Sequence, residues 1–187
     1  MKKTMVFVIM SLFLIIGSGA GYAGEKAPKK VVDLAESELV KLGTAPLIVE
    51  AVKAQNGKGM TLDEIKKKDE EWKAYAGIAD YMKSLMESPC AKYLRDIQKS
   101  ADYYSEIFVM DNQGANVAMT DKTSDYWQGD EAKFQKSFNG GSGALFIDEV
   151  EFDDSAQAYL VQVSVPVKEG DKVIGAITIG IDVDRIQ

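Results

Sequence analysis

The sequence of 187 residues contains no histidine and a single cysteine. Without histidine, the chain lacks the side chain most often used as a general base near neutral pH and the commonest ligand of transition metals. One cysteine excludes an internal disulfide and any zinc site built from several cysteines. No Ser–His or Cys–His nucleophile can form. We therefore expect no enzymatic activity, no cofactor and no metal.

Positive charge is also in short supply, because 22 Lys and Arg residues face 29 Asp and Glu residues, a formal net charge of −7. Nucleic acids and anionic lipid surfaces are bound by basic patches, so we expect no nucleic-acid partner. The hydrophobic share of 46% and the charged share of 27% are ordinary for a globular protein. The length fits one domain.

The only long apolar run lies at the N-terminus, between residues 5 and 16, where Ser11 is the one polar member. Lys2 and Lys3 precede the run, and small residues ending in Ala23 follow it. The run is short for a bilayer-spanning helix, which needs about 20 residues. This arrangement is typical of a secretory signal peptide cut after Ala23, and it predicts a periplasmic or secreted protein. An uncleaved membrane anchor is the alternative.

The chain is accordingly divided into a signal peptide, residues 1–23, and a single domain, residues 24–187. Its only cysteine, Cys90, would then lie in an oxidising compartment, where a lone cysteine is expected to be buried as a small hydrophobe.

The first half of this domain has the period of helices. Apolar residues recur at helical spacing over 31–42, and a continuation is expected from Thr44 as N-cap to about residue 56. Residues 61–64 form a capping box that opens a charged helix, and a further helix is expected to begin at Ser88–Pro89.

Beyond residue 104 the pattern changes to the alternation and short apolar runs of strands. Five strands are expected, at residues 106–110, 115–119, 144–152, 157–167 and 172–182. A short helix is expected after Gly129–Asp130. Because the connections are mostly short, the strands should form an antiparallel sheet. The predicted fold class is α+β, with long N-terminal helices packed on a five-stranded antiparallel sheet.

The last two predicted strands each have one bulky apolar face and one small or polar face, because alternate residues of a strand point to opposite sides. The polar face leaves space and offers hydrogen bonds, which suit a small ligand. Gln162, Ser164 and Thr178 lie on this face and are candidate ligand residues. Tyr159, on the apolar side, is a weaker candidate. The alternative is that the polar face is simply exposed to solvent.

The segment 120–131 follows a predicted strand and places two large aromatic residues among polar groups. Tyr126 and Trp127 each have an apolar body with a polar tip, which suits the enclosure of a small polar molecule. Lys122 offers a positive charge to a carboxylate. Alternatively, Tyr126 and Trp127 plug the edge of the sheet and Lys122 is a solvated surface charge.

Several segments resemble the Cache family of extracytoplasmic sensor domains, which are PDC-type and PAS-like. Residues 108–114 resemble the opening hairpin of these domains, and residues 125–128 lie where they often have a Trp/Tyr pair. Residues 163–184 are similar to their C-terminal hairpin, and residues 45–52 to their first long helix. The resemblance implies a single Cache domain, with a long helix behind a PAS-like sheet and a ligand pocket on the opposite face.

Cache domains bind small metabolites, often carboxylates or amino acids, and signal across the membrane. The resemblance implies an exported binding protein for such a ligand. Because the sequence ends at Gln187 without a second membrane segment, we expect it to act through a separate membrane partner. The arginine that often precedes the aromatic pair in amino-acid-binding relatives is missing here. The alternative is a ligand-free interaction module, for instance a homodimer, which an exposed apolar stripe on residues 31–56 would distinguish.

Overall fold

The computed structural model describes residues 24–154 and 156–186. The predicted signal peptide, residues 1–23, lies outside the described residues. Within the described part of the chain, no helix is both long enough and apolar enough to cross a membrane.

The N-terminal half is helical, as the spacing predicts. Its elements are α1 (Lys29–Ser37), the 3₁₀ helix η1 (Leu39–Thr44), α2 (Pro46–Asn56), α3 (Leu62–Ala74), α4 (Asp80–Glu87) and α5 (Pro89–Gln98). The prediction of Thr44 as N-cap of α2 is wrong. Thr44 is the last residue of η1 and Ala45 occupies the N-cap, so the chain turns one residue later than expected. Helix α4 was not predicted.

Two helix starts follow directly from local sequence. The hydroxyl of Thr61 accepts a hydrogen bond from the amide of Glu64, and the Glu64 carboxylate accepts one from the amide of Thr61. This reciprocal pair satisfies two amides that would otherwise have no partner at the start of α3. At α5, the hydroxyl of Ser88 accepts from the amide of Ala91, and Pro89 occupies the first helical position.

The C-terminal half forms one five-stranded antiparallel sheet, which confirms the predicted α+β fold class. Its strands are β1 (Tyr104–Met110), β2 (Asn116–Met119), β3 (Phe146–Asp153), β4 (Ala158–Glu169) and β5 (Lys172–Asp182), in the spatial order β2-β1-β5-β4-β3. Helix α6 (Ala132–Phe138) and the short 3₁₀ helix η2 (Asn139–Gly141) connect β2 to β3. The rings of Phe134 and Phe138 stack along α6.

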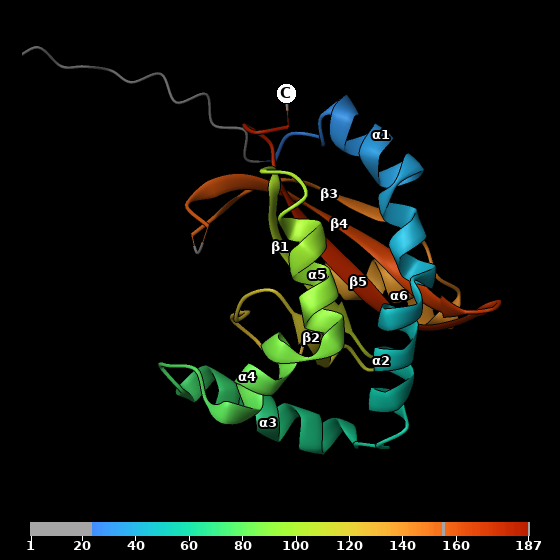
Figure 1. Cartoon of the computed structure of the whole chain (residues 1–187), viewed down its shortest axis with the longest axis vertical. Coiled ribbons are helices and arrows are strands. Elements are labelled where there is room, and N and C mark those ends of the chain that lie inside the picture. Colours follow the sequence, from blue (N-terminus) through green and yellow to red (C-terminus); the bar gives the residue numbers. More distant parts are fainter. Residues whose placement is uncertain (1–23, 155, 187) are drawn as a thin grey trace, which may run out of the picture.

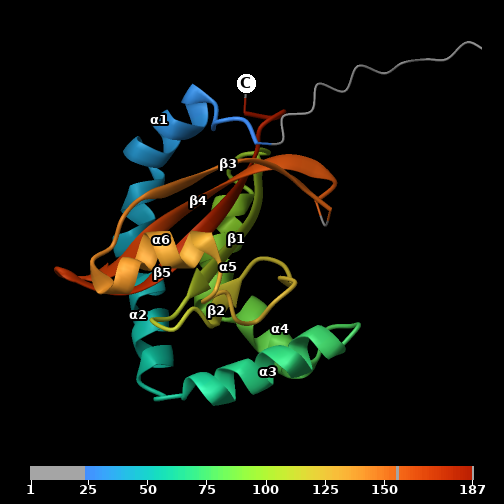
Figure 2. The same ribbon diagram turned by 180° about the vertical axis from the view of Figure 1, so that it is seen from behind.

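The two faces of the sheet carry different cores. Helices α1, α2 and α5 cover one face and stand in front of the sheet in Figure 1. The alternate side chains of β4 and β5 that were expected to be apolar, such as Val163 and Ile179, are buried there. Seen from behind, α6 lies across the other face, with α3 and α4 at one end of the molecule (Figure 2). Phe108 and Ala176 meet Trp72 of α3 and Phe134 of α6 in this second core.

The homodimer alternative predicts an exposed apolar stripe on the N-terminal helices, within residues 31–56. Within residues 31–56, Leu47 is the one large hydrophobic side chain that is exposed, at 46%. The other large apolar residues of this segment are buried or partly buried, whereas Pro46 and the small Ala54 are exposed. The continuous exposed stripe that a dimerisation helix requires is therefore not present on this segment.

Candidate functional site

A cavity of about 480 Å³ lies on the face of the sheet that α3 and α6 cover. Strands β1 and β4, the end of α3, the start of α6, the segment after β2 and the β3–β4 turn all contribute to its walls. Its lining residues are Trp72, Lys73, Glu106, Phe108, Lys122, Thr123, Ser124, Gln128, Lys133, Asp153, Asp154 and Gln162. The walls therefore carry both ammonium and carboxylate groups.

The floor of the cavity is a polar bridge across three strands. Gly180 of β5 pairs with Glu106 of β1 on one side and with Gln162 of β4 on the other. A side chain at Gly180 would place its Cβ 2.8 Å from the Cγ of Glu106, so glycine makes room for the bridge. The side-chain amide of Gln162 donates a 3.0 Å hydrogen bond across Gly180 to the carboxylate of Glu106.

Glu106 is a partly buried carboxyl group. Burial raises its pKa, while the ammonium of Lys133 and the hydrogen bond from Gln162 oppose that rise. Lys133 of α6 lies 5.4 Å from the centre of the Phe108 ring and 3.1 Å from the carboxylate of Glu131. The floor thus has an acidic group that stabilises a proton or a cation, beside an ammonium that stabilises an anion.

One wall depends on α3 holding the segment after β2. The buried carboxylate of Asp69 accepts hydrogen bonds of 2.8 and 3.0 Å from the amides of Tyr126 and Trp127. Its other oxygen lies 2.7 Å from the ammonium of Lys73. The indole of Trp72 donates a 2.8 Å hydrogen bond to the carbonyl of Thr123. Helix and segment therefore form one connected wall.

The lysines that line the cavity differ in the protein groups that their ammonium groups already contact. Lys73 is shared between the carboxylates of Asp69 and Asp125, at 2.7 and 3.0 Å, and hydrogen bonds to these two groups raise its pKa. Lys122 donates to two backbone carbonyls, and its ammonium lies 5.8 Å from the centre of the Trp72 indole. Lys133 forms an ion pair with the carboxylate of Glu131, which itself is partly exposed.

Two of the predicted ligand residues, Lys122 and Gln162, line this cavity. Ser164 and Thr178 lie on the same face of the sheet but are completely buried, and their hydroxyl groups are 2.8 Å apart. The alternation along the strands therefore places these side chains on the expected side. The cavity reaches Gln162 and not the two hydroxyls.

The predicted aromatic residues lie outside the cavity lining. Tyr126 is 1% exposed, and its hydroxyl accepts a hydrogen bond from the Gln55 amide. The indole of Trp127 donates a 2.7 Å hydrogen bond to the carbonyl of Gln113, in the β1–β2 turn. Tyr159 packs against Phe152 and the core on the opposite face. The ligand roles of all seven residues stay predictions.

Several lining residues were not anticipated from the sequence. Glu106, Phe108 and Met110 follow each other at every second position of β1, so they share one face of the strand. The period of two could therefore have placed Glu106 on the cavity face. Lys133 lies in the short helix that was expected after Gly129–Asp130, directly before the buried Phe134 of α6. Trp72 comes from α3, and no local signal in the sequence shows that this helix meets the segment after β2.

No family model and no curated protein matches the sequence. Among solved structures, the sensor domain of the V. cholerae histidine kinase DctB matches 84% of this chain at 13% identity, with a TM-score of 0.46. The ligand-binding domain of the Campylobacter jejuni chemoreceptor Tlp3, in complex with 4-methylisoleucine, matches 85% at 12% identity and a TM-score of 0.43. The E. coli DcuS sensor domain matches 66% at 20% identity and a TM-score of 0.38.

The lengths of these proteins differ from that of the present chain. The matches cover 52% of the DctB domain, 61% of the Tlp3 domain and 92% of the DcuS domain. The chain thus spans about half of the DctB domain and three fifths of the Tlp3 domain. The chemical class of any ligand is therefore inferred from the residues that line this cavity, and not from these similar structures.

Proposed function

We propose that the chain is an exported sensory domain that binds a small carboxylate or amino acid in this cavity and acts through a separate membrane partner. The observation that carries the proposal is the cavity itself, about 480 Å³ with polar groups converging on its floor. Sites for small molecules commonly measure about 300–1,000 Å³ and place a few polar groups around an apolar surface. Phe108 and Trp72 supply that apolar surface.

The charges of the lining suit a ligand with an anionic group. Lys133 stands beside Phe108 on the floor, and a carboxylate there would gain a charge-assisted hydrogen bond. Glu106 and the acidic β3–β4 turn lie close by and would accept the ammonium of an amino acid. Gln162 can turn either its amide nitrogen or its oxygen toward the ligand.

Export and the membrane partner rest on the sequence. The predicted signal peptide supports a location outside the cytoplasm, and the resemblance to Cache domains supports a role in a signalling system. The bound state would then be read by a second protein in the membrane.

A thermal-shift experiment on the purified protein tests the binding site. The panel contains the standard amino acids and a series of monocarboxylates and dicarboxylates, including L-alanine and succinate. A ligand present at about 100 times its dissociation constant should stabilise the protein by roughly 2.7 kcal/mol. The proposal fails if no member of the panel raises the melting temperature.

Two variants of α6 make the test specific. Lys133→Met removes the ammonium that faces the floor and should abolish the shift. Lys136→Met is the matched control, because Lys136 is exposed on the same helix and does not line the cavity. Equal shifts in the two variants would place the ligand elsewhere.

A further inference from the structure

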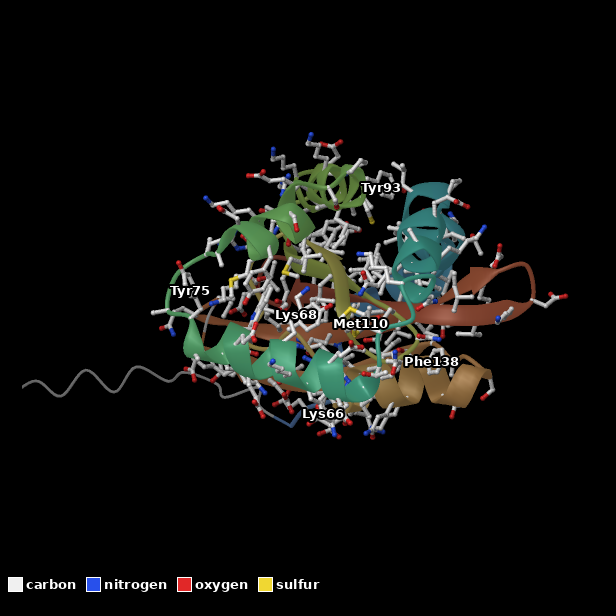
Figure 3. All side chains as sticks on the ribbon, turned by 90° about the horizontal axis from the view of Figure 1, so that it is seen from below. Lys66, Lys68, Tyr75, Tyr93, Met110 and Phe138 are labelled. Atoms are coloured by element: carbon white, nitrogen blue, oxygen red, sulfur yellow. The ribbon has the colours of Figure 1, made fainter. Side chains whose placement is uncertain are left out.

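The connection between α3 and α4, residues 75–79, is called the α3–α4 loop. Figure 3 shows Tyr75 where α3 ends and the chain turns toward α4. The ammonium of Lys122 lies 2.7 Å from the carbonyl oxygen of Tyr75 and 3.1 Å from that of Gly77. Lys122 comes from the segment after β2, so these two hydrogen bonds tie the loop to a wall of the cavity.

Ala79, at the end of the loop, packs against the second core and donates a hydrogen bond to Met82, but little else holds residues 75–78. Among the described residues, the amides of Ala76, Gly77 and Ile78 donate no hydrogen bond, and only Lys122 donates to a carbonyl between residues 75 and 78. Tyr75 and Ile78 are each 49% exposed, so they add little packing. A loop with few buried contacts opens at a low free-energy cost, and its closed position therefore depends on Lys122.

Lys122 is also part of the cavity lining. An ammonium group has three N–H donors, and the two loop carbonyls use two of them. The third donor remains for a group in the cavity. A carboxylate there would form a charge-assisted hydrogen bond with the same nitrogen that holds the loop.

We propose that Lys122 is a latch that couples occupancy of the cavity to the position of the α3–α4 loop. An anionic group in the cavity fixes the Lys122 ammonium at the place where it also holds Tyr75 and Gly77, so binding closes the loop more firmly. By thermodynamic linkage, a loop that is held closed strengthens binding by the same factor. This inference rests on the proposed function, because it requires an anionic group in the cavity.

Cleavage by chymotrypsin after Tyr75 measures how often the loop opens. Without ligand, Lys122→Met should be cut at the Tyr75–Ala76 bond about tenfold faster than the wild type, because both tethers are lost. Lys122→Arg keeps the charge and the donors and should restore slow cleavage. Lys83→Met is the matched control, because Lys83 lies on α4 close to the loop and outside the cavity lining. Equal rates for Lys122→Met and Lys83→Met would overturn the latch.

Adding L-alanine or succinate tests the coupling. Whichever probe raises the melting temperature should slow cleavage of the wild type severalfold and leave the rate of Lys122→Met unchanged. A probe that stabilises the protein without slowing cleavage would overturn the coupling and leave the binding function intact. If no panel molecule raises the melting temperature, the proposed function fails and the coupling fails with it.

Discussion

The hydroxyl group of Ser164 on β4 lies 2.8 Å from the hydroxyl group of Thr178 on β5, and both side chains are completely buried. The two residues are direct partners in the register of these strands. One hydroxyl therefore donates a hydrogen bond to the other, and neither is left without a partner in the buried sheet. The polar face of the last hairpin is divided into a closed part at this pair and an open part at Gln162.

The first prediction concerns this pair. Ser164→Ala should lower the free energy of unfolding by about 1–2 kcal/mol, because the buried Thr178 hydroxyl loses its partner. The double variant Ser164→Ala/Thr178→Val should cost less than the sum of the single changes, since it leaves no unpaired hydroxyl. Urea unfolding of the four proteins measures both effects. Strictly additive costs would show that the two hydroxyls do not stabilise each other.

The second prediction concerns the wall of the cavity. Asp69→Ala should destabilise the protein by about 3 kcal/mol, because the amides of Tyr126 and Trp127 lose their charged acceptor. Glu70→Ala is the matched control, since Glu70 is exposed on the same helix. Chemical unfolding compares the two variants. The account of the wall is wrong if they are equally stable.

The third prediction follows from the raised pKa of Glu106, which burial causes. The native state then keeps the proton to a higher pH than the unfolded state, so this contribution to stability is present in acid and is lost as the pH rises through the native pKa. Lys133, Gln162, Asp121 and Asp153 are the groups that act on Glu106. Glu106→Gln is neutral at every pH, so its stability relative to the wild type should increase as the pH rises above about 4, the ordinary pKa of a glutamate side chain. A stability difference that does not change with pH would contradict this assignment.

The fourth prediction concerns Cys90, which is 3% exposed, so the burial predicted for it from the sequence is confirmed. Burial raises the pKa of its thiol to about 12, so almost no thiolate exists at pH 8. A thiol reagent should therefore label native Cys90 at least about a hundredfold more slowly than the denatured chain. In Ser84→Cys, the added thiol on the exposed face of α4 should react fast while Cys90 stays slow. Rapid labelling of Cys90 in the native protein would show that the core opens around it.

Local signals in the sequence determined much of the fold. The capping box at Thr61 and the Ser88–Pro89 start depend on residues within four positions of each other, so their helices could be predicted. The period of two placed Gln162 and Thr178 on the correct face of the sheet. Helix α4 has no such start signal, because Ala79 at its N-cap offers no side-chain acceptor.

The lining of the cavity was harder to predict, because it depends on contacts between distant segments. The sequence left open whether Trp127 faces a ligand or plugs the structure. In the structure, its indole N–H donates to the carbonyl of Gln113. A tryptophan N–H can bind a backbone carbonyl as readily as a ligand, so the sequence alone could not distinguish the two roles. Trp72 lines the cavity wall where Trp127 was expected. Its hydrogen-bond partner Thr123 lies 51 positions later in the sequence, so no local pattern could reveal this contact.

Isothermal titration calorimetry on a variant with a blocked cavity tests the central claim most directly. Ser124 is exposed and lines the cavity, so Ser124→Trp should fill the cavity without disturbing the core. The panel molecule with the largest thermal shift should bind the wild type and should not bind Ser124→Trp, whose melting temperature should stay close to that of the wild type. Unchanged affinity in Ser124→Trp would contradict the claim that this cavity is the binding site.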